Sequence, residues 1–333
     1  MSGELGASLL PDRVHLRDRP SVTLLRPVLQ LTVYFEPTLE WAHTTAPSLL
    51  RSFLALRSHS PPRLFRVASD ARWRPLPDPV EELIDALPPS SFGTGLRPGF
   101  RLRVVDHPDA PSHAFVYREH DPRLGAPSGY MQVTLPLDRD PEELVALAIE
   151  IAQTAPIDQA LAGYAWSWNE QLPRNAFGAV ARRAERYLGV DVQHPDAASW
   201  HAHEVLLGAG WLTLIGGRLS RALGLDLDRA AATLRSPEVG ATCMSLQHAL
   251  LIRAGAAPEV GDVNAMELPL AQARVTAALA PHLGGDEPAL SGVFSEPETP
   301  EDHPPEGRTA AWRRRLLSAD AQPDAPPPAE TLR

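Results

Sequence analysis

The 35 prolines constrain the fold of this 333-residue chain most. Proline fixes φ and lacks an N–H donor, so it ends helices and interrupts the hydrogen bonding of paired strands. Together with the 22 glycines, this number of prolines predicts many turns and some unstructured stretches. The ordered part of the protein is therefore expected to be shorter than the chain.

Proline and acidic residues are densest at the C-terminal end, from residue 285 to residue 333. Only one short helix, at 310–317, is predicted there. A segment of this composition cannot bury enough apolar surface to fold alone. We expect 285–333 to be a disordered tail.

Strand and helix patterns alternate through the preceding chain. Along 29–35, apolar residues alternate with Gln30, Thr32 and Tyr34, which is typical of a strand with one buried face. The uncharged run 205–217 predicts a buried strand at the centre of a sheet. Further strands are predicted at 64–67, 101–105, 113–118, 130–135, 163–168 and 249–254. Helices are predicted near Pro47, at 80–87, 140–151, 177–188, 218–223 and 227–234, and from Pro269.

The helix at 140–151 has the residues of a capped start. Asp140 can accept a hydrogen bond from a free N–H group, and Pro141 suits the first turn because its missing donor is not needed there. Glu143 is predicted to complete a capping box.

These patterns predict an α+β fold with a mixed, largely antiparallel sheet flanked by helices. No composition break occurs within 28–284, so this segment is expected to form a single domain. Residues 1–27 show no clear periodicity and are expected to be an N-terminal extension.

The formal net charge is −10, with a pI of about 5.6. An acidic protein repels phosphate backbones, which disfavours general nucleic-acid binding. The same charge is compatible with a basic protein partner. The composition does not indicate an oligomeric state.

The single cysteine, Cys243, excludes an intramolecular disulfide and fits a reducing compartment. It lies in an apolar run, so a buried and inert thiol is expected. We find no signal-peptide pattern, and no uncharged run reaches the roughly 18 residues of a spanning helix. The prediction is a cytoplasmic protein with no membrane partner.

One cluster of potential metal ligands stands out, at His201, His203 and Glu204. No H-E-x-x-H or C-x-x-C pattern completes a ligand set near it. Nucleophile elbows and phosphate-binding loops are also absent from the sequence. We therefore expect no metal, no cofactor and no catalytic residues.

Seven tryptophans are present in a chain with few aromatic residues. Trp166 and Trp168 share one face of a predicted strand, and Trp200 and Trp211 flank a predicted loop. Core packing explains most of them. An exposed tryptophan would be informative, because tryptophan is a frequent anchor of protein interfaces.

Three segments carry a resemblance to the type VI immunity family of bacteria. Residues 31–41 (LTVYFEPTLEW), followed by a helix and then 72–76 (RWRPL), resemble the opening of that family. Residues 210–217 (GWLTLIGG), with Leu219 and Leu223 after them, are similar to its central W-L-T signature. Residues 261–264 (GDVN) match its closing element. The three segments span about 30–283 in the family's order.

The resemblance implies an immunity protein that binds and neutralises a cognate antibacterial toxin, in some members a nuclease effector. Within the signatures, Trp211, Leu212 and Thr213 look like sheet core. Gly261, Asp262 and Asn264 look like a tight turn. These residues are expected to be structural, and the resemblance assigns no toxin-binding residue.

Two alternatives remain open from the sequence. The protein could be an enzyme that uses a metal site at His201 and His203, which a bound metal would favour. It could instead be a scaffold that acts through its C-terminal tail, which loss of activity on tail removal would favour.

Overall fold

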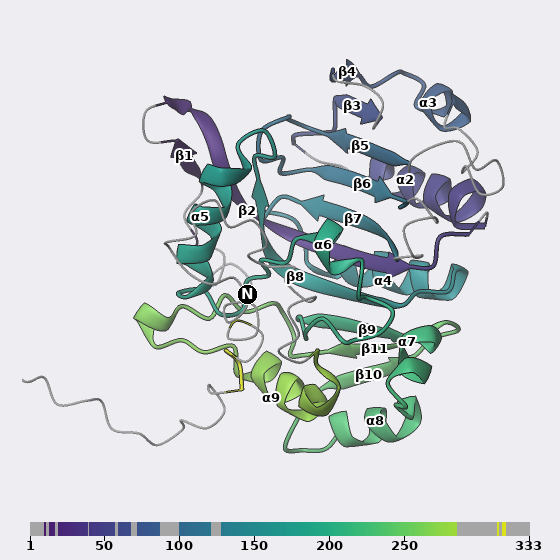
Figure 1. Ribbon diagram of the computed structural model, residues 1–333, viewed down its shortest axis with the longest axis vertical. Helices are drawn as coiled ribbons and strands as arrows, with labels where there is room; N and C mark the ends of the chain where they lie inside the picture. The colour runs from purple at the N-terminus through teal and green to yellow at the C-terminus, as the bar shows by residue number, and fades with distance from the viewer. Residues whose placement is uncertain are drawn as a thin grey trace, which may run out of the picture.

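An eleven-stranded sheet runs through the computed structural model of the protein (Figure 1). The structure describes residue 10, residues 13–16, 19–38, 40–56, 59–67, 72–86, 100–120 and 128–284, residue 312, and residues 315–317. The strand order is β10-β11-β9-β8-β2-β7-β6-β5-β3-β4, and β1 pairs with β2. The strands are β1 Val14–Leu16, β2 Arg19–Phe35, β3 Leu64–Val67, β4 Arg74–Pro75, β5 Arg101–Val105, β6 Ala114–Arg118, β7 Gly129–Leu135, β8 Gln159–Trp168, β9 Leu212–Gly216, β10 Thr242–Ser245 and β11 Ala249–Arg253.

Helices lie on both faces and at one end of this sheet. They are α2 Ala46–Ala55, α3 Glu81–Ala86, α4 Glu142–Thr154, α5 Pro173–Ala184, α6 Pro195–Ala198, α7 Gly217–Ala222, α8 Leu227–Leu234 and α9 Leu270–Leu279. A π-helical turn, η1 Trp41–Thr45, precedes α2, and two 3-10 turns, η3 Val263–Ala265 and η4 Ala280–His282, flank α9.

All pairings between the strands of the sheet are antiparallel, while two isolated bridges are parallel. The predicted α+β class is confirmed.

The central strand β2 is 17 residues long and pairs with β8 on one side and β7 on the other. It contains Pro27, which cannot donate a hydrogen bond to a neighbouring strand. The pairing with β7 begins only at Leu29, so at Pro27 one edge of β2 has no ladder partner. The predicted start of this strand at Leu29 is therefore wrong. The strand begins at Arg19, and residues 19–27 of the expected N-terminal extension belong to the sheet.

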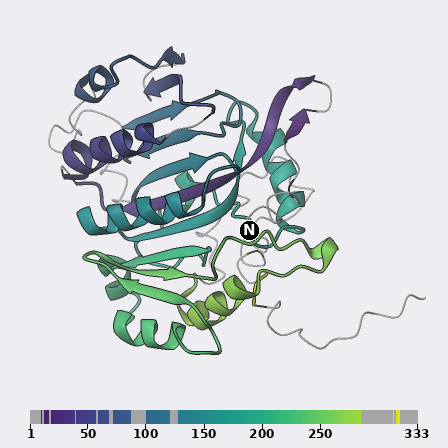
Figure 2. The same cartoon turned by 180° about the vertical axis from the view of Figure 1, so that it is seen from behind.

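One face of the sheet is apolar and is covered by helices. Leu29, Leu31, Val33 and Phe35 of β2 lie on this face and belong to the main hydrophobic core. Buried side chains of α2 and α4 join the same core. These two helices lie behind the sheet in Figure 1 and in front of it in Figure 2. The period-two pattern therefore places apolar side chains where helices can cover them.

The other face of the sheet carries buried polar side chains, because an irregular segment covers it. Gln159 of β8 donates hydrogen bonds to the carbonyls of Ala202 and Val205, at 2.6 and 2.8 Å. Its side-chain oxygen accepts a bond from the Leu207 N–H at 3.0 Å. A loop has backbone groups without ladder partners, so a sheet that lies beneath it needs polar side chains to satisfy them. Residues 205–211 are thus a tethered loop, and only Leu212–Gly216 of the predicted strand 205–217 is strand.

A second core lies at the β10 end of the sheet. Ile215 and Leu219 pack there with Leu234 of α8, Ile252 of β11 and Leu279 of α9. The edge strand β10 was not predicted, because its side chains are mostly exposed and show no alternation of buried residues. Cys243 lies on β10 and is half-buried, so the expectation of a buried thiol is wrong. Burial still raises the pKa of the Cys243 thiol, which opposes formation of the reactive thiolate.

The start of α4 differs from the predicted capping box. Asp140 does cap the first turn, since its Oδ1 accepts a hydrogen bond from the Glu142 N–H at 3.0 Å. The Glu143 carboxylate instead pairs with Arg139, at 2.5 Å. Other boundaries differ as well: β8 begins at Gln159 rather than 163, and α5 spans Pro173–Ala184 rather than 177–188.

Part of the expected C-terminal tail packs against the folded body. Leu316 is 1% exposed and packs with Ala273 of α9. Arg315 donates from Nε to the Leu188 carbonyl at 2.8 Å, and its guanidinium lies 3.5 Å from the centre of the Trp312 ring. Of the predicted helix 310–317, only residues 312 and 315–317 are described. The rest of the expected tail, including Arg313 and Arg314, lies outside the described residues.

Replacing Leu316 by alanine should lower the free energy of unfolding by about 2–5 kcal/mol, because it leaves a cavity beside α9. Urea denaturation followed by tryptophan fluorescence measures the change. Met266→Ala is the control, since Met266 is 87% exposed and should change stability by less than about 0.5 kcal/mol. If the two variants were equally stable, Leu316 would not be part of the core.

Candidate functional site

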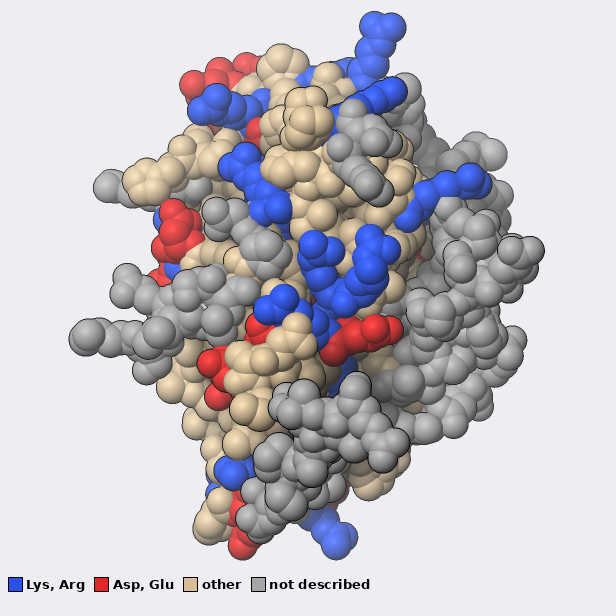
Figure 3. Space-filling view, turned by 90° about the vertical axis from the view of Figure 1, so that its left-hand side faces the viewer, with Lys and Arg blue, Asp and Glu red and all other residues tan. Residues whose placement is uncertain are grey.

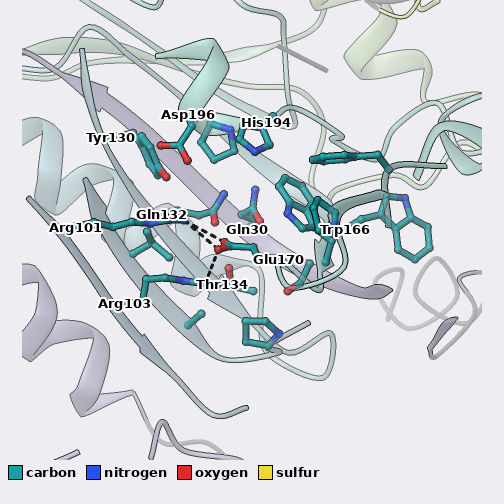
Figure 4. A pocket seen from close by; sticks show the side chains of 18 residues that line it. Gln30, Arg101, Arg103, Tyr130, Gln132, Thr134, Trp166, Glu170, His194 and Asp196 are labelled. Atoms are coloured by element: carbon teal, nitrogen blue, oxygen red, sulfur yellow. Dashed lines mark hydrogen bonds and ion pairs between the residues drawn. The ribbon is translucent and has the colours of Figure 1, made fainter. Parts of the chain in front are cut away.

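A cavity of about 180 Å³ opens on the polar face of the sheet, between the strands and the segment that carries α6 (Figure 4). Gln30 of β2 and Gln132 and Thr134 of β7 contribute side chains to it. Gln30 and Gln132 each donate a hydrogen bond to Thr32 Oγ1, at 3.3 Å. The residues that line the cavity are Gln30, Arg101, Arg103, Pro111, Ala114, Val116, Tyr130, Gln132, Thr134, Trp166, Ser167, Trp168, Glu170, Pro173, Phe177, His194, Pro195 and Asp196.

Two arginines of β5 share a single carboxylate in this cavity. Arg101 and Arg103 are two residues apart on one strand, so their side chains lie on the same face. Glu170, just after β8, lies 2.5 Å from Arg103 Nη1 and 3.2 Å from Arg101 Nη2 (Figure 4). The Arg103 side chain is only 5% exposed, whereas that of Glu170 is 29% exposed. The ion pair therefore holds a buried positive charge at the cavity.

A third arginine adds to this charge. Arg66 of β3 is directly opposite Arg103 in the strand pairing, and like charges in that position repel. The Trp73 ring partly relieves the repulsion, because both guanidinium groups lie over it, at 4.7 and 5.3 Å from its centre. Burial lowers the pKa of Arg103, and repulsion from Arg101 and Arg66 lowers it further, against the opposing effect of Glu170. For Arg101 the balance is reversed: burial lowers its pKa, but attraction to Tyr130, Glu170 and Asp196 outweighs burial and raises it.

Asp196, in the first turn of α6, lies across the cavity from Arg103 (Figure 4). Its Oδ1 is 3.6 Å from Arg118 Nε. Burial alone would raise the pKa of Asp196, but Arg101, His194 and Arg118 together hold it below its ordinary value. Asp196 is therefore ionised at neutral pH, and it balances the charge of Arg118.

An aromatic cluster forms another part of the wall. The rings of Trp168 and His194 are stacked with centres 5.6 Å apart, and Phe177 of α5 lies 5.8 Å from Trp168 and 5.7 Å from His194. Such a wall can pack against an apolar or planar group. The cavity thus combines fixed charges with an aromatic surface, which suits ligand binding.

A serine and a histidine meet beside the cavity, where Ser199 Oγ lies 2.8 Å from His120 Nε2. Burial and the nearby Arg118 lower the pKa of His120 to about 4, so the ring is neutral at neutral pH. Ser199 is 0% exposed, so its hydroxyl cannot reach a substrate. The pair is part of the packing between α6 and the end of β6.

The structure places the W-L-T signature in the sheet. Leu212 and Thr213 are the first residues of β9, and Trp211 directly precedes them. All three side chains are buried. Trp211 Nε1 donates to the Gly255 carbonyl at 3.4 Å, and Thr213 Oγ1 accepts from the Gly210 N–H at 3.0 Å. These residues lie away from the cavity described above.

The G-D-V-N signature forms a turn between β11 and α9. Gly261 has φ +68°, and a Cβ there would lie 2.6 Å from Pro269 Cδ, so both conformation and space require glycine. Asp262 caps η3 by accepting a bond from the Asn264 N–H at 3.0 Å. Its carboxylate also accepts two bonds from Arg186, at 2.9 and 2.7 Å. Asp262 therefore fixes the turn to the segment after α5.

The histidine cluster does not gather a ligand set. His201 Nδ1 and His203 Nε2 lie 3.9 and 3.5 Å from oxygens of Glu204. Within the described ranges, no group of three or more His, Cys, Asp or Glu side chains is arranged to hold a metal ion. Trp200, close to this cluster, is 39% exposed, and its ring is tilted by 47° against that of His120, with ring centres 5.7 Å apart.

Arg101, Arg103, Glu170 and Asp196 were not singled out from the sequence. A signal was present for the two arginines, because they occupy alternate positions in an otherwise apolar strand. Charged residues on the inner face of a strand require a partner. Their partner Glu170 lies 67 residues from Arg103 in the chain, and no local pattern links the two.

Asp262 should give the protein a pH-dependent contribution to stability. The hydrogen bonds from Arg186 hold the pKa of Asp262 below its ordinary value. Its contribution is fully present above the unfolded-state pKa of about 3.9 and is lost as pH falls through the lower folded-state pKa. Asp262→Asn should therefore destabilise the protein at pH 7, by an amount that shrinks toward pH 2.

Urea denaturation at several pH values measures this difference. Asp138→Asn is the control, because Asp138 is exposed and no hydrogen bond to Arg186 involves it. A stability difference between wild type and Asp262→Asn that did not change with pH would contradict the assigned role.

Comparisons with known proteins agree with the fold and the motifs. A family model described as type VI immunity for VRR-NUC, TsiV, matches residues 108–316, which is more than half of the chain. This match extends beyond residue 284 and includes the packed residues Trp312 and Leu316. No curated protein matches the chain.

A solved structure, the Pseudomonas aeruginosa T6SS protein PA0821, has a similar fold, with a TM-score of 0.76 and 17% sequence identity. The similarity covers 96% of this chain and 93% of that chain. At this identity the likeness establishes the fold alone. The matched residues include the W-L-T and G-D-V-N segments, whereas 31–41 and 72–76 lie outside them. The family match confirms the predicted resemblance: the chain belongs to the type VI immunity family for VRR-NUC.

Proposed function

We propose that the protein binds a VRR-NUC effector directly and neutralises it in the cytoplasm of the cell that makes both. The family match over residues 108–316 carries this proposal. The description of the family names a nuclease class as the target of immunity. No helix in the described part of the chain is both long and apolar enough to cross a membrane.

Binding, rather than catalysis on the effector or its product, is the proposed mode of action. The serine–histidine pair is buried, and His201 and His203 meet only Glu204 among the carboxylates described. The cavity side chains Arg101, Arg103 and Glu170 are engaged with one another. These features are suited to recognition of a partner or ligand.

The negative charge of the chain is unevenly distributed. Residues 285–333 contain ten acidic residues and five arginines, a net charge of −5, which is half of the total of −10. Arginine side chains gather over the middle of the side on which β1 and α5 lie (Figure 3). The net charge therefore does not describe this side of the molecule, where arginine side chains gather.

The turn that carries η3 is the proposed contact with the effector. It projects from the body between β11 and α9, on the side of α5 (Figures 1 and 2). Met266 is 87% exposed and has a positive φ of 55°, which is unusual for a residue other than glycine. Val263 and Leu270 are also exposed large apolar residues.

The buried signature residues hold this turn in place. Gly261 and Asp262 face inward, where Asp262 binds Arg186, while Val263 and Met266 face solvent. A rigid apolar projection loses little entropy on binding and can fill a pocket in a partner. This arrangement separates the scaffold residues of the signature from the residues that would contact the effector.

Co-expression with its cognate VRR-NUC effector should restore the growth of cells that make the effector and yield a co-purifying complex. Neutralising a lethal nuclease requires a dissociation constant of about a nanomolar or lower, on the order of −12 kcal/mol. Growth and pull-down from the same cultures measure the two effects. Failure to rescue growth would contradict the immunity function. Rescue without a complex would contradict direct binding.

Met266→Glu should weaken effector binding by at least about tenfold, because it places a charge at the centre of an apolar contact. Titration of the effector by calorimetry measures the change. Met244→Glu is the matched control, since Met244 is 45% exposed on the edge strand β10. Equal affinities of the two variants would exclude the η3 turn as the contact while leaving the immunity function intact.

A further inference from the structure

We propose that the cavity on the polar face of the sheet binds a small organic monocarboxylate, with its acidic group at Arg101 and its body against the aromatic wall. This site is independent of the proposed effector contact. Its ligand would be a free small molecule, and the cavity volume of about 180 Å³ is far larger than one water molecule requires.

The charges at the cavity call for an anion. Arg101 and Arg103 share one carboxylate, that of Glu170, and Arg66 lies opposite Arg103 in the strand pairing. Across the cavity, Asp196 lies 3.6 Å from Arg118, and both Arg101 and Arg118 lower the pKa of its carboxyl, so two carboxylates face four arginines. One added negative charge near Arg101 would therefore reduce the remaining imbalance. Arg101 is the accessible member of the cluster, since its side chain is 22% exposed, compared with 5% for Arg103.

The buried polar atoms of the lining that lack hydrogen-bond partners also favour an anionic ligand. Three buried donors there have no hydrogen-bond partner, namely Arg101 Nε, Arg103 Nε and Trp166 Nε1. Among the buried acceptors of the lining, only Asp196 Oδ1 has no hydrogen-bond partner. Buried polar groups are normally paired. The excess of donors favours an acceptor ligand over a cationic one.

A monocarboxylate fits better than a phosphate. The planar carboxylate matches the planar guanidinium group of arginine. A phosphate dianion would be repelled more strongly, because Glu170 and Asp196 already line the cavity. The rings of Trp168, Phe177 and His194 offer an apolar surface to the rest of the ligand. An aromatic carboxylate satisfies both requirements.

Titration calorimetry of the full-length protein with benzoate, benzamide and inorganic phosphate tests this site. Benzoate should bind in a saturable one-to-one manner. Benzamide has the same shape without the charge and should bind at least about tenfold more weakly, because its neutral amide cannot form the ion pair with Arg101. Equal binding of benzoate and benzamide, no binding of benzoate, or tighter binding of phosphate would each overturn the proposal.

Two variants locate the binding in the cavity. Arg101→Gln should weaken benzoate binding by about tenfold to a hundredfold. Ala114→Leu keeps every arginine and fills part of the cavity, so it should also weaken binding at least tenfold. Circular dichroism and thermal unfolding check that each variant folds. Benzoate affinity unchanged in a folded Arg101→Gln or Ala114→Leu protein would overturn the proposal.

Arg139→Gln is the matched control for Arg101→Gln. Arg139 also forms an ion pair with one glutamate, Glu143, and its side chain is 21% exposed. It lies at the start of α4, away from the cavity lining. Benzoate should bind this variant with the affinity of the wild type. An equal loss in Arg139→Gln and Arg101→Gln would show a general charge effect and would contradict the site.

Discussion

The register of β2 is the constraint on which the rest of the structure depends. This strand is hydrogen-bonded on both sides, to β7 and to β8, so one alignment must satisfy two ladders at once. Because side chains alternate between faces, a slip of one residue would move Gln30 and Thr32 into the apolar core. The same slip would turn Leu29, Leu31 and Val33 toward the polar face. The pairing therefore fixes the chemistry of both faces.

The two faces differ because different structures cover them. Helices satisfy their own backbone groups, so α2 and α4 can cover an apolar face. An irregular segment leaves backbone groups unpaired, and the polar side chain of Gln159 satisfies several of them. Where that segment does not fill the space above the strands, the polar face remains as the lining of the cavity. The cavity thus follows from the way in which the sheet is covered.

The sequence predicts the parts of this fold that local periodicity encodes. The strands 101–105 and 249–254 agree with β5 and β11 within one residue, and 227–234 agrees with α8. The first half of β2 was not predicted, because Pro20 and Pro27 normally indicate the end of a strand. They are compatible with a strand only where one of its edges has no hydrogen-bonded neighbour, which the sequence does not show. The exposed edge strand β10 has no buried face and so no alternation. Such features depend on neighbours that are distant in the chain.

Prediction of the site is also limited because its residues are distant from one another in the chain. The W-L-T and G-D-V-N motifs are local, and both mark elements that the structure contains. The cavity brings together β2, β5, β7, the residues after β8 and the start of α6. No short spacing links Arg103 to Glu170 or Asp196, so a reading of local motifs cannot assemble the site. The tertiary fold has to be known first.

The position of β2 in the chain has a consequence for protein synthesis. β2 ends at Phe35, whereas β8 begins at Gln159, 124 residues later. At about 5–20 residues per second, a ribosome needs roughly 6–25 s to make that intervening segment. During this time the segment LQLTVYF has a high β-propensity and lacks one of its partner strands, so it is prone to pair with other chains. The time for which β2 lacks its second partner strand is therefore set by the distance to β8.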